Sequence, residues 1–143
     1  MITYDYLKNL TKEQAIEEHR KMWNWIADKT FELQQCMTKD DYITQELLID
    51  IDSEILIQAN SSCFCCLYAS NVAKTVEKCK CKCCPIDWGK HTTDAYMCES
   101  VDIENLMVRG IYSEWVYALE NYDYEECARL ARQIANLPEA INK

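Results

Sequence analysis

Cysteine is the residue type with the clearest chemistry in this sequence. Cys63 and Cys66 form one CxxC pair, Cys81 and Cys84 form another, and fourteen residues lie between the pairs. A CxxC turn lets two sulfur atoms reach the same ion, and two such turns supply the four thiolates that tetrahedral zinc binds at about 2.3 Å. The spacing therefore predicts a zinc ion held by these four cysteines.

Further sulfur atoms crowd the same stretch, because three more cysteines interleave with the two pairs. Pro85 follows Cys84 directly and suits a knuckle turn, which favours Cys81 and Cys84 as ligands over Cys79. Closely spaced cysteines of this kind can also bridge two ions, so a second ion is the alternative to a single zinc. The interleaved residues are Cys65, Cys79 and Cys83, and the additional candidate ligands are Cys79, Cys98 and His91.

The predicted zinc site is structural rather than catalytic. Four protein ligands fill the coordination sphere and leave no position for a reactive water. No HExxH motif is present, and the two glycines, Gly89 and Gly110, cannot form a phosphate-binding loop. His19 shares a helical face with Met22 and Trp23, which favours a packing role. We therefore expect no enzymatic reaction.

The sequence also predicts the compartment in which these thiols work. Residues 1–10 lack the basic start and apolar run of a signal peptide. The longest apolar stretch, 47–57, is interrupted by three acidic residues and is too short to cross a membrane. We therefore expect a cytoplasmic protein without membrane contact, where grouped cysteines stay reduced and bind metal. Eight of the ten cysteines lie between 63 and 98, and the other two are Cys36 and Cys127.

Charge is distributed unevenly along the chain. The net charge is −9, yet residues 71–90 contain five lysines and two acidic residues, so this window carries +3 and the remainder −12. An acidic surface favours solubility or a basic partner and repels nucleic acid. The lysines near the zinc turns could instead contact phosphate, as in a nucleic-acid-binding zinc knuckle. The candidate contact residues for a partner in this window are Lys78, Lys80 and Lys82, with Lys74 beside them.

Helices must position the zinc segment from both sides. Thr11 and Gln14 form a capping box, and apolar residues then recur at helical spacing, which predicts a helix from about Lys12 to Gln35. Thr38 with Asp41 repeats the start signal for a second helix running toward Ile57, although its isoleucines would also suit a strand. The first part of the chain is therefore predicted to be a helical arm over 11–58, followed by the cysteine-rich segment over 60–98.

Two more helices are expected after the last cysteine of that segment. Asp102 can cap a helix that closes at 121–123, and Asp123 with Glu126 begins a final helix that ends near Asn136, before Pro138. These two helices predict an αα-hairpin over 102–137. The whole chain, 1–143, is expected to be a single, mainly α domain with a central four-cysteine zinc knuckle.

Trp25 is a candidate partner-binding residue. Trp23 and Trp25 are two positions apart on one predicted helix, so their side chains point to nearly opposite faces. If Trp23 lies in the core, Trp25 either packs against the cysteine-rich middle or stays on the surface, where tryptophan is often a binding hot spot.

Four motifs together suggest a family. HRKMWNWIA, CFCC, CCPIDWG and LARQIANLPE resemble motifs of a group of small, uncharacterised zinc-binding proteins of Firmicute phages and prophages, and the likeness runs from His19 to Pro138. The resemblance implies a phage origin and metal ligands at Cys63, Cys66, Cys81 and Cys84, with Cys98 as an additional candidate. It implies no reaction, and the interleaved cysteines depart from the group's pattern.

Two functional hypotheses follow from the sequence. The first is a non-enzymatic, zinc-stabilised phage accessory protein that binds a host protein in the host cytoplasm and inhibits a defence system. The second is a nucleic-acid-binding zinc module that uses the lysines around residues 74–82. Neither hypothesis specifies an oligomeric state.

Overall fold

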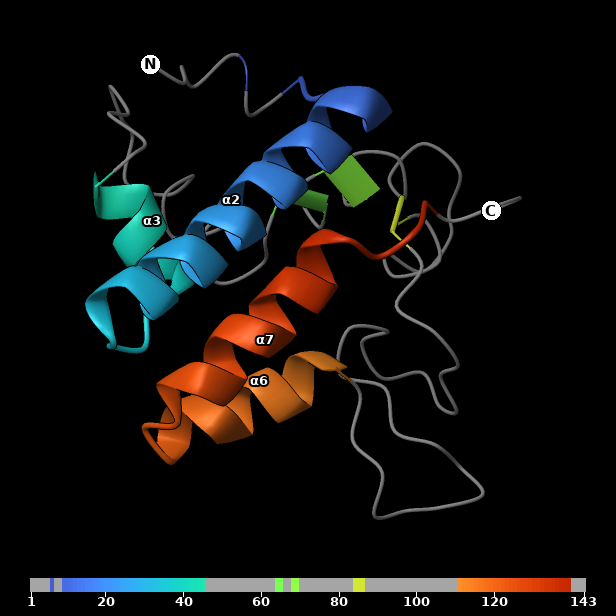
Figure 1. Ribbon diagram of the computed structural model, residues 1–143. Coiled ribbons are helices and arrows are strands. Elements are labelled where there is room, and N and C mark those ends of the chain that lie inside the picture. The colour runs from blue at the N-terminus through green and yellow to red at the C-terminus, as the bar shows by residue number, and fades with distance from the viewer. Residues whose placement is uncertain are drawn as a thin grey trace, which may run out of the picture.

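The part of the chain with described structure is mostly helical. The computed structural model in Figure 1 describes residues 6, 9–45, 64–65, 68–69, 84–86 and 111–139. These ranges contain helices α2 (Lys12–Leu33), α3 (Lys39–Gln45), α6 (Ile111–Glu120) and α7 (Tyr124–Ala135). Within them no strand occurs, and residues Ile86 and Glu139 form an isolated antiparallel bridge. The prediction of a mainly α protein is confirmed for this part. The predicted elements over 46–58 and 102–110 lie outside the described residues.

Helix α2 begins and ends at local signals. The Thr11 side chain accepts a hydrogen bond from the Gln14 backbone at 3.1 Å, and the Gln14 side chain accepts one from the Thr11 backbone at 3.0 Å. The predicted capping box is therefore confirmed. The helix ends at Leu33, two residues before the predicted end, because Gln34 adopts the left-handed conformation with φ of 53°.

Helices α3 and α7 also begin at the predicted residues. The Thr38 backbone donates to the Asp41 carboxylate at 2.9 Å, and the Asp41 backbone donates to the Thr38 hydroxyl at 3.2 Å. Asp123 caps α7 by accepting a hydrogen bond from the Glu126 backbone at 3.2 Å. The last helix ends at Ala135, with Asn136 as its C-cap, in agreement with the predicted end.

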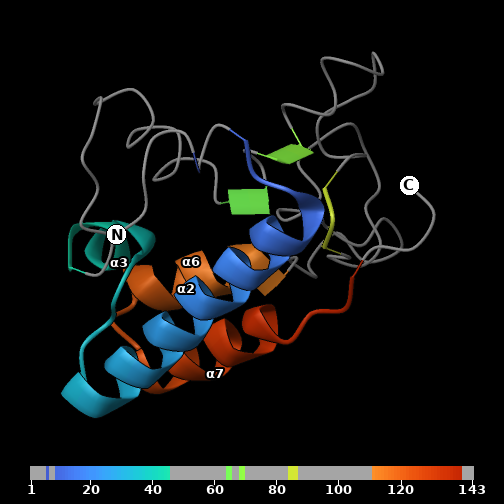
Figure 2. The same ribbon diagram turned by 90° about the horizontal axis from the view of Figure 1, so that it is seen from above.

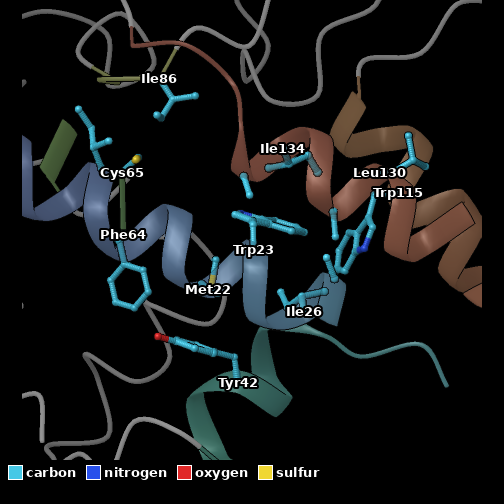
Figure 3. Packing of buried hydrophobic residues seen from close by; sticks show 14 of the residues in the cluster. Met22, Trp23, Ile26, Tyr42, Phe64, Cys65, Ile86, Trp115, Leu130 and Ile134 are labelled. Carbon is cyan, nitrogen blue, oxygen red and sulfur yellow. The ribbon is translucent and has the colours of Figure 1, made fainter. Parts of the chain in front are cut away.

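The helices pack around α2. Helix α7 runs along α2, α6 packs on α7, and the short α3 covers another part of α2, as both views show (Figures 1 and 2). Trp23 lies in the middle of the shared core, with Met22, Ile26 and Ile134 around it (Figure 3). The cysteine-rich segment contributes to the same core. Its described core residues are Phe64, Cys65, Ala69, Cys84 and Ile86.

The loop between α2 and α3 is fastened by one buried side chain. Thr30 is fully buried, its carbonyl oxygen accepts the Gln35 backbone N–H at 3.3 Å, and its hydroxyl accepts the Met37 backbone N–H at 3.2 Å. The loop backbone is thus hydrogen-bonded to the last turn of α2 at Gln35 and at Met37.

We expect Thr30→Val to lower the free energy of unfolding by about 1–3 kcal/mol, because the buried Met37 N–H would lose its acceptor while the side chain keeps its shape. Urea denaturation measures this difference. The comparison variant is Thr11→Val, which removes an exposed helix cap and should cost about 1 kcal/mol. A Thr30→Val variant as stable as the original protein would show that this hydrogen bond does not hold the loop.

Candidate functional site

One predicted zinc ligand lies in the described structure. Cys84 is 6% exposed and belongs to the core cluster, next to buried Pro85 and Ile86. Within the described ranges, no group of three or more histidine, cysteine or acidic residues could hold a metal ion. The zinc site therefore stays a prediction. The other predicted or additional ligands, namely Cys63, Cys66, Cys81, Cys79, Cys98 and His91, lie outside the described residues.

Cys65 is a packing residue. It is fully buried, and its thiol donates a hydrogen bond to the Ala15 carbonyl oxygen on α2, with 3.7 Å between sulfur and oxygen. Its neighbour Phe64 is buried in the same core at 1% exposure. Its burial and its contact with the first turn of α2 give Cys65 a packing role in the core.

The two cysteine-bearing stretches contribute to the same core. Phe64 and Cys65 of the first stretch and Cys84 and Ile86 of the second all belong to the buried core cluster, and Figure 3 shows Cys65 and Ile86 on the same side of Trp23. Residues 64 and 65 lie inside the first CxxC, and Cys84 closes the second. The fold thus brings one part of each motif into the same core cluster.

The predicted partner-binding residues divide into two groups. Trp25 is half-buried, and its ring packs edge-on against Tyr42 of α3, with ring centroids 5.4 Å apart. Trp23, on the other face of α2, is 1% exposed. The ring that covers Trp25 among the described residues therefore comes from α3. The predicted phosphate or partner contacts Lys78, Lys80 and Lys82 lie outside the described residues, so the nucleic-acid hypothesis stays a prediction.

His19 fastens the end of α7 to α2. It is fully buried, and its Nε2 donates a hydrogen bond to the Ile134 carbonyl oxygen at 3.1 Å. That carbonyl belongs to the last turn of α7, where carbonyl oxygens have no backbone N–H donor within the helix. Arg20 donates to the Leu137 carbonyl oxygen at 3.4 Å. The motifs HRKMWNWIA and LARQIANLPE therefore contact each other, and His19 has the packing role that its position predicted.

Glu18 is a buried acid that the sequence did not single out. It is 4% exposed, accepts a hydrogen bond from the Tyr6 hydroxyl at 3.2 Å, and lies 3.7 Å from the Lys21 ammonium. Burial, followed by the charge of Glu18, raises the pKa of Tyr6 to about 12. The carboxylate is thus satisfied by two partners, and Tyr6 keeps its proton at neutral pH. The arrangement stabilises the start of α2.

Two cysteines from distant parts of the sequence meet beside α2. Cys36, in the loop after α2, lies with its sulfur 3.3 Å from the sulfur of Cys127 on α7. Cys36 is half-buried and Cys127 is fully buried. These are the two cysteines outside the cysteine-rich segment, and that shared position was the signal in the sequence that could have identified the pair.

Large apolar side chains are exposed at one end of the helical unit. The C-terminal ends of α2 and α6 and the N-terminal end of α7 lie together at this end (Figure 1). Phe31 on α2 is 71% exposed, Tyr117 on α6 is 52% exposed, and Tyr122 in the α6–α7 turn is 86% exposed. We call Phe31, Tyr117 and Tyr122 the aromatic end. Several large aromatic side chains exposed at one end of a helical unit are typical of a binding surface.

Two open depressions flank α7 at the aromatic end. The first, of about 420 Å³, lies between α6 and α7 and is lined by Tyr117 and Leu130. The second, of about 570 Å³, lies between α2 and α7 and is lined by Phe31 and Tyr124. The first half of α7 thus forms a ridge between two hollows, each bordered by an exposed aromatic ring.

Comparisons with known proteins add no relative. No family model matches the chain, and no curated protein and no solved structure shows significant similarity to it. In the described part of the chain, no helix is long and apolar enough to cross a membrane.

Proposed function

We propose that this protein is a zinc-stabilised, non-enzymatic binding protein that docks a basic partner protein at the aromatic end. The observation that carries the proposal is the exposure of Phe31, Tyr117 and Tyr122 at the end of the helical unit that holds two depressions, one bordered by Phe31 and the other by Tyr117. Aromatic side chains supply large contact area with few rotatable bonds, which is why they dominate binding hot spots.

The charges around the aromatic end favour a basic partner. The depressions are lined by two arginines, and both are ion-paired: Arg129 with Glu126 on α7, and Arg132 with Asp28 on α2. Three further acidic residues line the hollows, and a partner that brings lysine or arginine to them would be attracted and oriented. These residues are Glu114, Asp123 and Glu125.

The backbone at Tyr122 points to selection for something other than stability. Tyr122 has φ of 54°, in the left-handed region where glycine is the least costly residue. Its side chain is largely exposed, so packing does not compensate for this cost. A binding role for the ring accounts for a tyrosine at this position.

The zinc part of the proposal assigns Cys63, Cys66, Cys81 and Cys84 as ligands. It is supported by the spacing of the two CxxC pairs and by the shared core cluster that holds Cys65, inside the first pair, and Cys84, which closes the second. The ion would close the cysteine-rich segment onto α2 and thereby support the helices that carry the aromatic end.

The partner is proposed to be a host protein. This proposal is based on the resemblance to phage and prophage proteins and on the net charge of −9, which suits a basic, nucleic-acid-binding component of a defence system. By presenting carboxylates where such a component expects phosphates, the protein would occupy its binding surface.

We expect Tyr122→Gly to reduce partner binding at least tenfold while raising the free energy of unfolding by about 0.5–1 kcal/mol, because the ring is lost and the left-handed backbone is relieved. Gln34→Gly makes the same backbone change at the end of α2, where φ is 53°, and removes no aromatic ring. The Gln34→Gly variant should gain similar stability and bind the partner with the affinity of the original protein.

Affinity purification from the host with the original protein and the two variants, followed by titration of the recovered partner, measures the effect on binding. Urea denaturation measures the effect on stability. The proposal requires a basic protein recovered in stoichiometric amount, with affinity that falls as salt is raised. Recovery of the same protein by the original chain and by Tyr122→Gly with equal affinity would exclude the aromatic end as the docking site. A salt-dependent gel shift with nucleic acid alone would favour the lysine-based alternative instead.

A further inference from the structure

We propose that Cys36 and Cys127 form a redox-active pair that a peroxide or a small-molecule disulfide converts into an intramolecular disulfide, which fastens the α2–α3 loop to α7. The two sulfur atoms are 3.3 Å apart in the thiol form. A disulfide bond is about 2.05 Å long, so a small movement of one side chain suffices to form it.

The loop presents Cys36 in a fixed position. The Gln35 and Met37 backbone N–H groups on either side of it are both hydrogen-bonded to Thr30, at 3.3 Å and 3.2 Å. The partner sulfur lies on α7, which packs along α2 and is capped by Asp123 a short distance before Cys127. Both sulfur atoms are therefore carried by ordered backbone, which lowers the entropy cost of joining them.

The pair fits redox chemistry better than metal binding. It supplies two thiols, and in the described ranges no third histidine, cysteine or acidic residue completes a metal-binding group with them. The two cysteines are also separated by 91 positions, so that neither belongs to a CxxC turn. Two adjacent thiols can form a disulfide when an external oxidant is present, and they need no third protein group for this reaction.

The different environments of the two thiols set the order of the steps. Cys36 is half-buried and open to a small oxidant, whereas Cys127 is fully buried. Burial, and then the contact with Cys36, raises the pKa of the Cys127 thiol far above its usual value. The oxidant therefore reacts first with Cys36, and Cys127 completes the bond.

The reaction balances with hydrogen peroxide as the oxidant. The Cys36 thiolate attacks one peroxide oxygen, which forms a sulfenic acid on Cys36 and releases hydroxide, and this hydroxide takes up the thiol proton to become water. The Cys127 sulfur then attacks the Cys36 sulfur, and a second water leaves. Two electrons pass from the two thiols to the peroxide. With a small-molecule disulfide, the same two electrons reduce it to two thiols.

The disulfide would join residues 36 and 127 and so enclose the stretch of chain between them, which contains all eight other cysteines. It would also join the loop after α2 to the part of α7 that borders the second depression, between Tyr124 and Ala128. Oxidation would thus hold α2 and α7 together even when the metal segment is lost. The inference does not depend on the proposed partner.

Trypsin allows a direct test, because Cys36 and Cys127 fall in separate peptides, 30–39 and 110–129, that each contain one cysteine. The folded protein is treated with one equivalent of oxidised glutathione, the remaining thiols are alkylated, and the peptides are analysed by mass spectrometry without reduction. We expect peptides 30–39 and 110–129 joined to each other as the main disulfide product. Oxidation should raise the melting temperature by roughly 10 °C, and dithiothreitol should reverse the shift.

Cys36→Ser is the main control, because the side chain is half-buried and tolerates a hydroxyl, and it should show neither the linked peptide nor the thermal shift. Cys127→Ala gives the same comparison from the other side of the bond. The inference is overturned if both peptides remain alkylated when cysteines in 63–98 have reacted, or if Cys36 is found joined mainly to one of those cysteines.

Discussion

Trp23→Ala is expected to remove about 4 kcal/mol or more of the free energy of unfolding, a large part of the total stability of a domain of this size. Trp23 is 1% exposed, and its ring meets Trp115 edge-on with centroids 4.8 Å apart and Tyr112 with centroids 6.2 Å apart. Truncation would leave a large cavity between α2 and α6 and remove two aromatic contacts. Urea denaturation followed by far-ultraviolet circular dichroism measures the loss without relying on tryptophan fluorescence.

Trp25→Ala provides a matched control on the same helix. Trp25 is half-buried and its described ring contact is with Tyr42 of α3, so we expect a loss of about 2 kcal/mol or less. The difference between the two variants isolates the effect of burial from that of residue type. Equal losses would contradict the assignment of Trp23 to the centre of the core.

Removal of zinc should have an effect at least as large. A four-thiolate site can hold roughly 10 kcal/mol or more of apparent binding free energy, which becomes folding free energy when the metal-free segment does not fold. We expect one zinc per chain by native mass spectrometry under reducing conditions. A strong chelator should abolish amide protection in 63–98 first, and protection in α2 and α7 should follow at higher denaturant or temperature.

Variants at two buried cysteines distinguish a metal ligand from a packing residue. Cys84→Ser should lower the zinc content sharply, whereas Cys65→Ala should keep one zinc and lose about 1 kcal/mol of stability from its small core cavity. Equal loss of zinc in both variants would make Cys65 a ligand. A reduced protein that is free of metal and still fully protected in 63–98 would remove the zinc site from the proposal altogether.

Helix starts were the most predictable part of the fold. The capping residues Thr11, Thr38 and Asp123 each bond to a residue three positions ahead, so the whole interaction is contained in a short stretch of sequence. The end of α2 was less predictable, since Gln34 rather than glycine takes the left-handed conformation. No residue type in the sequence marks that position.

The candidate site was less predictable than the helices. Spacing identified the CxxC pairs, but it could not show that Cys65 packs against Ala15 while Cys84 lies in the same core. The exposure of Phe31 and Tyr122 was also hidden, because an aromatic residue near a helix end is equally compatible with burial and with a surface.

The sequence by itself determined the helical class, the caps and the cysteine spacing, because each depends on neighbours a few residues away. The tertiary structure alone decided that Cys36 meets Cys127, that His19 binds the end of α7, and that Trp23 rather than Trp25 is enclosed. These outcomes depend on which face of α2 receives α7. That choice is made by the fit of whole apolar surfaces against one another, and no short stretch of sequence contains both sides of the contact.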